Sequence, residues 1–379
     1  MAKKESPLME VWLLIVGVYA VALVVAALVW GQIRQVEPTV TPDPSITVLV
    51  PARNEAERIL PLLNDLSRQQ YAGEWEVLVI DDHSEDETVA EAESLAGLLP
   101  LTVLSLRGMP GEPQGKKAAL AMGVAQARGE IIVTTDADCR VGPHWLATLT
   151  VPLREAKAQM VFGPVTYAGR SFWGRVQAIE FWSLQVIGAV SWQLGKPSMC
   201  NGANLAFRKS AMEAVGGYQP HAHVASGDDE FTLHAIREHF GPQAVQFQQH
   251  SNALVHTQPV ASLGAFLMQR RRWAGKWNLH QSATPRLMAT GVFAFHAVVV
   301  LGWVALALGT MPWQAVALGF GLKLVGEAIL LGAFSRTYRL GFPIAAFVWW
   351  QVLYSLYALG MGLIVQRGTY QWKGRTYDR

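Results

Sequence analysis

Four long apolar stretches, which flank a polar middle segment, constrain the fold of this chain more than any other feature. They cover residues 11–30, 287–309, 312–334 and 342–365. Each is close to the length that an α-helix needs to cross the hydrocarbon core of a bilayer. The sequence therefore predicts an integral membrane protein with one span before the polar segment and three spans after it.

The composition agrees with a membrane protein. Of the 379 residues, 51% are hydrophobic and 16% are charged, which is too apolar for an ordinary soluble enzyme. The first stretch lacks a small-residue cleavage site after a short apolar core, so we expect an anchor rather than a removable signal peptide. The net charge is +2, and the basic residues are scattered or lie beside apolar stretches. This argues against a nucleic-acid partner and favours lipid headgroups.

The basic residues of the short connections predict the orientation in the membrane. Arg34 follows the first stretch, and Arg336 and Arg339 lie between the third and the fourth. Positively charged connections stay on the cytoplasmic side, so four simple crossings place the polar segment in the cytoplasm and both termini outside. The basic tail at residues 367–379 then lies on the less favoured side. The alternatives are a last stretch that does not cross fully or an earlier one that is re-entrant.

The polar segment, residues 35–286, separates an anchor at residues 1–34 from a membrane region at residues 287–366. Within it, strands are predicted at residues 46–50, 75–80, 101–104 and 131–135, and helices from about residue 57 and over residues 116–127. This alternation is typical of βαβ units, which build a mostly parallel sheet. We therefore predict an α/β fold in which helices flank a Rossmann-like mixed sheet, together with transmembrane helices.

Acidic clusters follow two of these strands and recur once later in the chain. They are Asp81-Asp82, Asp136-Ala137-Asp138 and Asp228-Asp229-Glu230. Carboxylates placed just past the ends of parallel strands converge on the crevice in which α/β sheets bind ligands. Their hard oxygen atoms suit a divalent cation, and such a cation neutralises a diphosphate. The clusters therefore predict a site for a metal-bound phosphate ester.

Two segments of the polar middle predict helices at the membrane surface. Residues 259–280 contain the run Gln269-Arg270-Arg271-Arg272-Trp273, and residues 171–194 combine many aromatic and aliphatic side chains with few charges. Arginines can share the charge of a diphosphate, and a tryptophan suits a membrane boundary. The simpler interpretations are a basic surface helix for the first segment and an ordinary core helix for the second.

Taken in order, the motifs of the chain resemble those of the family 2 glycosyltransferases. They are Pro51-Ala52-Arg53-Asn54-Glu55, Val79-Ile80-Asp81-Asp82-His83-Ser84, Gly115-Lys116-Lys117-Ala118-Ala119-Leu120, Asp136-Ala137-Asp138, Gly227-Asp228-Asp229 and Gln269-Arg270-Arg271-Arg272-Trp273. The ordered set is more specific than any single motif, and it covers residues 46–273. The membrane pattern is similar to that of the membrane-embedded members, which include cellulose, hyaluronan and poly-N-acetylglucosamine synthases. The resemblance implies a GT-A fold.

The resemblance also implies a nucleotide-sugar site with a metal ion. Its donor-binding residues would be Pro51, Ala52, Arg53, Glu55, Asp82, Lys116, Asp136 and Arg272. Asp82 would read the uracil edge of a UDP-sugar. Asp136-Ala137-Asp138 resembles the DXD motif, in which Asp138 binds Mg²⁺ or Mn²⁺ directly and Asp136 lies nearer the ribose. The structural alternatives are a helix cap for Asp82 and a solvated helix start for Lys116.

For catalysis, the resemblance implies roles for the acid pair Asp228-Asp229. Asp229 would be the general base that takes a proton from an acceptor hydroxyl, and Asp228 would raise its basicity by like-charge coupling. Because the family more often has Glu-Asp here, the assignment within the pair stays open, and a helix cap is the structural alternative. In the QxxRW motif, Arg272 would contact the diphosphate, while Gln269 and Trp273 would bind the acceptor.

We therefore expect an inverting hexosyltransferase that moves a sugar from a UDP-sugar to a hydroxyl of a membrane-associated glycan or lipid. It would act in polysaccharide or cell-envelope glycan synthesis at the bacterial inner membrane. Its partners would be the donor, the acceptor, membrane lipids and either a second copy or an accessory export subunit. The alternatives are a transferase that adds one sugar to a lipid, a nucleotide-sugar binding partner without turnover, and a nucleotidyltransferase. No motif names the sugar.

Overall fold

The computed structural model describes residues 7–36, 43–154, 157–221, 224, 226–274, 283–364, 370–372 and 375–377 of the chain. The chain divides into two compact units. The helical unit is drawn from Met1–Ile33, Arg170–Val190 and Val260–Gly368, and the sheet unit from Arg34–Gly169, Ser191–Pro259 and Thr369–Arg379. Each unit is therefore assembled from separate segments of the sequence.

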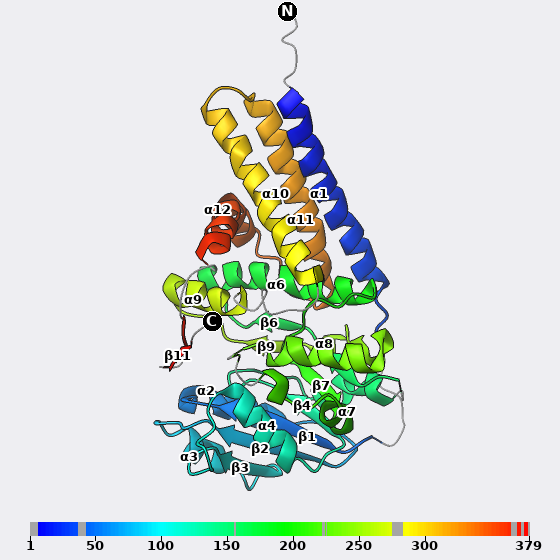
Figure 1. Ribbon diagram of the computed structural model, residues 1–379, viewed down its shortest axis with the longest axis vertical. Helices are drawn as coiled ribbons and strands as arrows, with labels where there is room; N and C mark the ends of the chain where they lie inside the picture. Colours follow the sequence, from blue (N-terminus) through cyan, green and yellow to red (C-terminus); the bar gives the residue numbers. More distant parts are fainter. Residues whose placement is uncertain are drawn as a thin grey trace, which may run out of the picture. The chain divides into compact units, whose positions relative to one another are not determined.

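A seven-stranded sheet forms the centre of the sheet unit (Figure 1). Its strands, in spatial order, are β3 (Leu101–Ser105), β2 (Trp75–Asp81), β1 (Ile46–Ala52), β4 (Ile131–Thr134), β7 (Leu205–Arg208), β5 (Met160–Phe162) and β8 (Val245–Phe247). Strand β7 runs antiparallel to both neighbours, and the other pairs are parallel. The structure confirms the predicted α/β class with a mostly parallel mixed sheet.

Two small sheets accompany the large one. Strand β6 (Val165–Tyr167) pairs with β9 (Val255–Thr257), and β10 (Tyr370–Trp372) pairs with β11 (Arg375–Tyr377). Strands β10 and β11 belong to the segment that the sequence predicts as a basic tail. The other residues of that tail, such as Arg367 and Arg379, lie outside the described residues.

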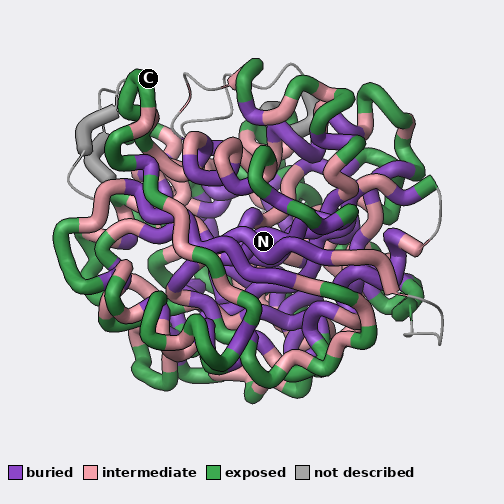
Figure 2. Tube along the Cα trace, turned by 90° about the horizontal axis from the view of Figure 1, so that it is seen from below, coloured by how far each residue is buried: buried purple, intermediate pink, exposed green. Residues whose placement is uncertain are grey.

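Helices cover the large sheet. They are α2 (Ala56–Leu66), α3 (Thr88–Glu93), α4 (Lys116–Gln126), α5 (Trp145–Leu149), α7 (Lys209–Ala214) and α8 (Asp228–Phe240), with short 3₁₀ turns at Val151–Arg154, Gln219–His221, Pro242–Ala244 and Ser251–Ala253. Strands β1, β2 and β4 are rich in Val, Ile and Leu and are almost entirely buried (Figure 2). Near-continuous apolar runs are typical of parallel strands that are covered on both faces.

The register of the sheet brings the ends of three strands to one edge. Ala52 at the end of β1 lies opposite Asp81 at the end of β2, and Thr134 at the end of β4 lies opposite Leu49 of β1. The loops that follow these strands therefore emerge at the carboxyl edge, where α/β sheets bind ligands. Those loops carry the predicted donor and metal motifs.

The helical unit contains helices α1 (Pro7–Gln32), α6 (Phe172–Gln193), α9 (Leu263–Ala274), α10 (Ala283–Ala307), α11 (Trp313–Thr337) and α12 (Ile344–Ile364). Among the residues that the structure describes, four segments are long and apolar enough to cross a membrane: α1, residues 287–307 of α10, α11 and α12. They match the four predicted apolar stretches. Helices α6 and α9 occupy the segments predicted to lie at the membrane surface, and that placement stays a prediction.

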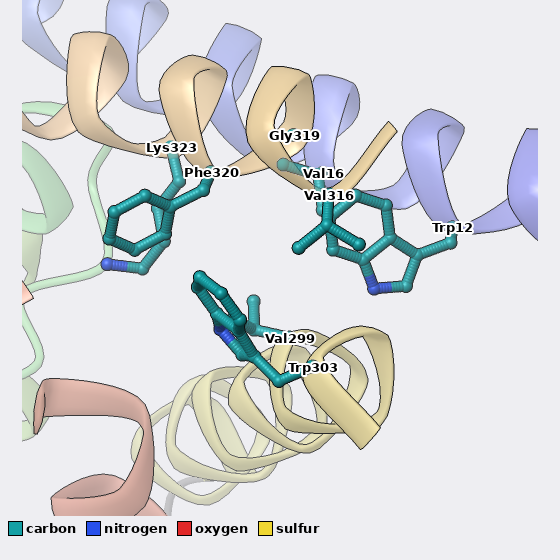
Figure 3. Close-up of a pocket in the computed structure, with 8 residues that line it drawn as sticks. All are labelled: Trp12, Val16, Val299, Trp303, Val316, Gly319, Phe320 and Lys323. Atoms are coloured by element: carbon teal, nitrogen blue, oxygen red, sulfur yellow. The ribbon is translucent and has the colours of Figure 1, made fainter. Parts of the chain in front are cut away.

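Trp12 of α1 packs into notches that glycines leave on α10 and α11. A Cβ atom at Gly302 or Gly319 would overlap the Trp12 ring, and Nε1 of Trp12 donates a hydrogen bond to the carbonyl of Val298 at 2.8 Å. Small residues let membrane helices approach closely, which matters because lipid provides no hydrophobic force between them. A small, mainly apolar hollow lies beside Trp12 between these three helices (Figure 3).

A buried polar cluster links three of the spans. Nζ of Lys323 lies 2.9 Å from Oε1 of Glu327, one turn away on α11, and also contacts Oε1 of Gln351 on α12. The hydroxyl of Tyr19 on α1 donates to Oε1 of Glu327 at 3.0 Å. Ionisable groups are costly inside a membrane unless they meet protein partners, and both charges have such partners here.

Candidate active site

A lysine and three carboxylates gather at the carboxyl edge of the sheet. Lys116 begins α4, Asp136 follows β4, and Asp228 and Asp229 begin α8. Nζ of Lys116 lies 2.5 Å from Oδ1 of Asp136 and 3.6 Å from Oδ2 of Asp228. Burial lowers the pKa of the Lys116 ammonium, but the three carboxylates raise it more, so the net shift is upward. The structure thus places three predicted site carboxylates around the positive charge of Lys116.

Glycines set the starts of both helices that carry these residues. Gly115 precedes α4 with a φ of 92°, and Gly227 precedes α8 with a φ of 83°. Residues other than glycine rarely adopt a backbone conformation with such a positive φ. The cap of α8 is Gly227, so neither Asp228 nor Asp229 is the helix cap. Both lie in the first turn, where the helix dipole favours negative charge.

The loop before β7 holds Asp229 in place. Oδ2 of Asp229 accepts a hydrogen bond from the backbone N–H of Gly202 at 3.0 Å, and Oδ1 accepts one from Glu230 at 2.8 Å. The hydroxyl of Thr134 donates to the carbonyl of Gly202 at 2.7 Å. A Cβ atom at Gly202 would lie 3.1 Å from Oδ2 of Asp228. Gly202 therefore fits closely against the acid pair, a role that the ordered motifs of the sequence do not assign.

Tyr218 is a second neighbour of the acid pair that the motifs do not single out. Its side chain is buried. Burial and the charges of Asp228 and Asp229 raise the pKa of its phenol, against an opposing effect of Lys116. The phenol therefore keeps its proton at neutral pH and is a hydrogen-bond donor. An isolated tyrosine carries no sequence signal for this position.

The residues after β1 and β2 form a connected wall beside Lys116. The backbone N–H of Asp82 donates to the carbonyl of Ala52 at 2.8 Å, and Nη1 of Arg53 donates to the carbonyl of Asp82 at 3.0 Å. Oδ2 of Asp82 accepts from the backbone N–H of Gly115 at 3.1 Å. These contacts bring Ala52, Arg53, Asp82 and Lys116 of the predicted donor site together.

Pro51 and Glu55 flank the same wall. Pro51 lies in β1 opposite Ile80 of β2. Glu55 is buried at the start of α2, where its backbone N–H donates to Oγ1 of Thr88 at 2.7 Å and its carboxylate lies 3.5 Å from Nη1 of Arg58. These contacts fix the loop after β1, and the role of Glu55 in donor binding stays a prediction.

The two aspartates of the DXD motif have different neighbours. Oδ1 of Asp138 accepts a hydrogen bond from the hydroxyl of Thr257 at 3.2 Å, whereas Asp136 pairs with Lys116. Within the described ranges, no group of three or more His, Cys, Asp or Glu side chains could hold a metal ion. Mg²⁺ sites in nucleotide enzymes commonly use one or two carboxylates and complete the shell with phosphates and water. Asp136 and Asp138 fit such a partial ligand set.

The QxxRW motif lies on α9, in the helical unit. The ring of Trp273 lies 5.7 Å from that of Phe181 on α6, and the guanidinium of Arg270 lies 4.3 Å from the Trp273 ring centre. Arg270 also donates to Oε1 of Gln269. Arg272 lies in the last turn of α9. The sequence assigned no role to Arg270, because the motif leaves its position open.

Comparison with known families identifies the domain that carries the site. Residues 47–216 match the profile of Glycosyl transferase family 2. This chain contains a glycosyl transferase family 2 domain. The match supports a glycosyltransferase and confirms the predicted family resemblance. The family 2 match includes Pro51 to Asp138 but ends before Asp228-Asp229 and the QxxRW motif, so the acid pair rests on its geometry.

Several relatives with similar sequences carry glycosyltransferase names. Glycosyltransferase AglE of Haloferax volcanii is 25% identical over 296 residues, which are 77% of this chain and 90% of that protein. A beta-monoglucosyldiacylglycerol synthase of Trichormus variabilis is 30% identical over 243 residues, which are 61% of this chain and 48% of that protein. An N-acetylglucosaminyltransferase of Mesorhizobium japonicum is 25% identical, and the match covers 57% of it. The chain thus spans about half the length of the last two relatives.

A solved structure confirms the fold of the family 2 domain. The mannosyltransferase PcManGT from Pyrobaculum calidifontis, in complex with GDP-Man and Mn2+, matches with a TM-score of 0.61 at 22% identity. The match covers 87% of this chain and 99% of that chain. This likeness establishes the predicted GT-A fold.

Proposed function

We propose that this chain is an inverting glycosyltransferase that transfers a hexosyl group from a UDP-sugar to a hydroxyl of a membrane-associated lipid or glycan. The observation that carries the proposal is the cluster in which Lys116 lies within 3.6 Å of both Asp136 and Asp228, with Asp229 fixed beside it by Gly202. Such a cluster supplies a proton acceptor and a positive charge at the edge where α/β sheets bind nucleotides. The family 2 domain supports the same reaction class.

Asp229 is the proposed general base. Its hydrogen bonds from the backbone of Gly202 and Glu230 favour the ionised carboxylate. As the acceptor hydroxyl attacks the anomeric carbon, its proton passes to Asp229 and a new C–O bond forms. The bond between the anomeric carbon and the diphosphate oxygen breaks, and UDP leaves with that electron pair. Attack from the opposite face inverts the anomeric configuration, with no covalent enzyme intermediate.

Several groups would supply positive charge near the leaving diphosphate. Lys116 stays protonated because the neighbouring carboxylates raise its pKa, and Arg272 is proposed to contact the diphosphate. A divalent cation, Mg²⁺ or Mn²⁺, would be held by Asp138 and Asp136 and would supply further neutralising charge when bound. Asp82 and the wall at residues 51–55 are proposed to hold the uracil.

The acceptor is proposed to lie in the membrane. In the described part of the chain, four helices are apolar and long enough to cross a bilayer. A relative whose name, beta-monoglucosyldiacylglycerol synthase, refers to a glycolipid is 30% identical. We favour the addition of one sugar to a lipid. The complete run from Gln269 to Trp273 favours a growing glycan as the second candidate, which would also need a second copy or an export subunit. The length of the product separates the two.

The test uses the full-length protein in detergent with Mn²⁺ or Mg²⁺, native lipid extract and a panel of UDP- and GDP-sugars, and it follows nucleotide release. We expect metal-dependent UDP release that Asp138→Ala abolishes. Asp229→Asn should lower the rate by about 10²-fold or more, while calorimetry shows unchanged UDP binding. Glu238→Gln, which alters an exposed acid on the same helix, should keep the wild-type rate.

Four outcomes would contradict this proposal. Release of GDP alone would refute the UDP-sugar donor, and release of diphosphate would indicate a nucleotidyltransferase. Wild-type rates in Asp229→Asn would remove Asp229 as the base. A protein that binds UDP but releases nothing from any donor would be a nucleotide-sugar binding partner.

A further inference from the structure

A buried ion pair joins the helix of the QxxRW motif to a second helix. Arg270 of α9 is 4% exposed, and Glu180 of α6 is 6% exposed. Nε of Arg270 donates to Oε1 and Oε2 of Glu180 at 2.9 and 3.0 Å, and Nη2 donates to Oε2 as well. Paired hydrogen bonds between a guanidinium and a carboxylate are strong and fix the relative orientation of both groups.

The same carboxylate also binds a membrane span. The hydroxyl of Tyr357 on α12 donates to Oε1 of Glu180 at 3.3 Å. Glu180 therefore connects its own helix α6 with both α9 and α12. The three residues Glu180, Arg270 and Tyr357 form what we name the clamp.

Arg270 also touches the motif residues themselves. Nη1 of Arg270 donates to Oε1 of Gln269, and the guanidinium lies 4.3 Å from the ring centre of Trp273. Trp273 packs in turn against Phe181, the residue after Glu180, with ring centres 5.7 Å apart. Both residues predicted to bind the acceptor are thus held by one guanidinium and its surroundings.

Stability alone is a weak reason for this arrangement. The cost of removing two charges from water offsets most of their attraction, and apolar side chains of similar volume often stabilise as well. What a rigid, planar guanidinium adds is geometric definition, because its donors lie in a fixed fork. Because Arg270 contacts Gln269 and Trp273, its fixed geometry also orients these two residues of the motif.

We infer that the clamp positions Gln269 and Trp273 for the acceptor. This inference rests on the proposed function and adds positioning residues to it. Arg270, Glu180 and Tyr357 act through Gln269 and Trp273. Loss of the clamp should therefore impair the use of acceptor while leaving the affinity for UDP unchanged.

The first test needs no substrate. Glu180→Gln removes the negative charge of the clamp. Glu327→Gln is the matched control, because Glu327 also pairs with a buried cation, at 2.9 Å, and accepts a hydrogen bond from a tyrosine hydroxyl, at 3.0 Å. The fluorescence of Trp273 is isolated by subtracting the spectrum of each protein's Trp273→Phe version. We expect Glu180→Gln to shift this isolated emission to longer wavelength, because Trp273 becomes less well packed, and Glu327→Gln to leave it unchanged.

The second test measures acceptor use in the full-length protein. With the preferred donor in excess, the concentration of native lipid extract that gives half-maximal transfer should rise about 10- to 100-fold in Glu180→Gln, as expected for a misplaced binding group. Calorimetry with UDP and Mn²⁺ should give the wild-type affinity. Glu327→Gln should match the wild type in both measurements.

An unshifted Trp273 emission in Glu180→Gln, or an equal shift in Glu327→Gln, would overturn the inference. If Glu180→Gln does not fold, Arg270→Lys decides by the same emission, because lysine keeps the charge but lacks the fork; an unchanged spectrum there refutes the clamp. A wild type that binds UDP yet transfers nothing would refute the proposed function, and the fluorescence would still decide the role of the clamp.

Discussion

Lys116 offsets the mutual repulsion of the acidic cluster. Its ammonium lies within 3.6 Å of two carboxylates, and a third raises its pKa. At about 4 Å and an effective dielectric constant of about 20, two unit charges interact by about 4 kcal/mol. The Lys116 ammonium thus lies where a metal-bound diphosphate is proposed to bind. The ammonium and the metal ion would repel each other there.

Replacing Lys116 by methionine should therefore tighten the binding of Mn²⁺ in the absence of nucleotide by at least about tenfold. The measurement is a Mn²⁺ titration followed by electron paramagnetic resonance. Lys117→Met is the matched control, because it removes a neighbouring ammonium whose Nζ donates to the carbonyl of His221 at 2.8 Å. Equal Mn²⁺ affinity in both variants would show that the ammonium does not compete with the metal.

Single residues differ in how far the sequence predicts them. The sequence motifs next to strand ends or helix starts include Asp82, Lys116, Asp136 and Asp228. The register of the strands brings these ends to one edge of the sheet. Gly202 acts through a backbone N–H, which every residue except proline has, so its role has no signature of its own. The role of Arg270 depends on a partner 90 residues away, Glu180, and becomes visible only once α6 and α9 are placed.

At the scale of elements, close helix approach in the helical unit depends on glycines. Gly302 and Gly319 make room for the ring of Trp12, and a Cβ atom at Gly326 would lie 3.1 Å from Cα of Ala20. Helix α1 therefore packs through its tryptophan and its small residues against α10 and α11. A rigid indole ring has few ways to yield to an added methyl group.

Gly319→Ala should accordingly destabilise the protein by about 1–3 kcal/mol through overpacking. The thermal midpoint of the detergent-solubilised chain measures this. Gly321→Ala, on the same helix but with no atom within 4 Å of its added Cβ, should keep or raise the midpoint, because alanine favours helix more than glycine does. Similar midpoints for the two variants would mean that α1 and α11 do not pack as described.

Long elements are predictable from the sequence and short ones are not. The four spans and strands β1 to β4 show sustained apolar runs, and the structure places each within a few residues of its predicted range. Strands β5, β6, β8 and β9 have three residues each. Three residues are too few for any periodicity, so only pairing with distant partners defines such strands.

For the whole molecule, the order of the spans determines which loops share a side of the membrane. The span α1 precedes the first segment of the sheet unit, Arg34–Gly169. The spans α10, α11 and α12 follow its second segment, Ser191–Pro259. If each crosses once, the loop between α10 and α11 lies opposite the loop between α11 and α12. The arginines of the latter predict that it faces the cytoplasm.

Cysteine labelling tests this orientation in a Cys200→Ala background, in which the remaining Cys139 is buried. An impermeant maleimide should label Thr310→Cys on intact cells. It should label Arg339→Cys and Glu93→Cys, on α3 of the sheet unit, only after the membrane is opened. The reverse pattern would place the catalytic site outside, where nucleotide sugars are scarce, and labelling of all three would exclude four simple crossings.

The clamp also sets an order of events during synthesis. The carboxylate of Glu180 and the hydroxyl of Tyr357 are 177 residues apart in the chain. The ribosome therefore completes the central strands of the sheet unit and the spans α10 and α11 before it makes α12. Until then, the nascent chain carries an acid and an arginine that lack their final enclosure. The clamp is therefore complete only after α12 has been made, and the proposed acceptor site reaches its full affinity only in the finished chain.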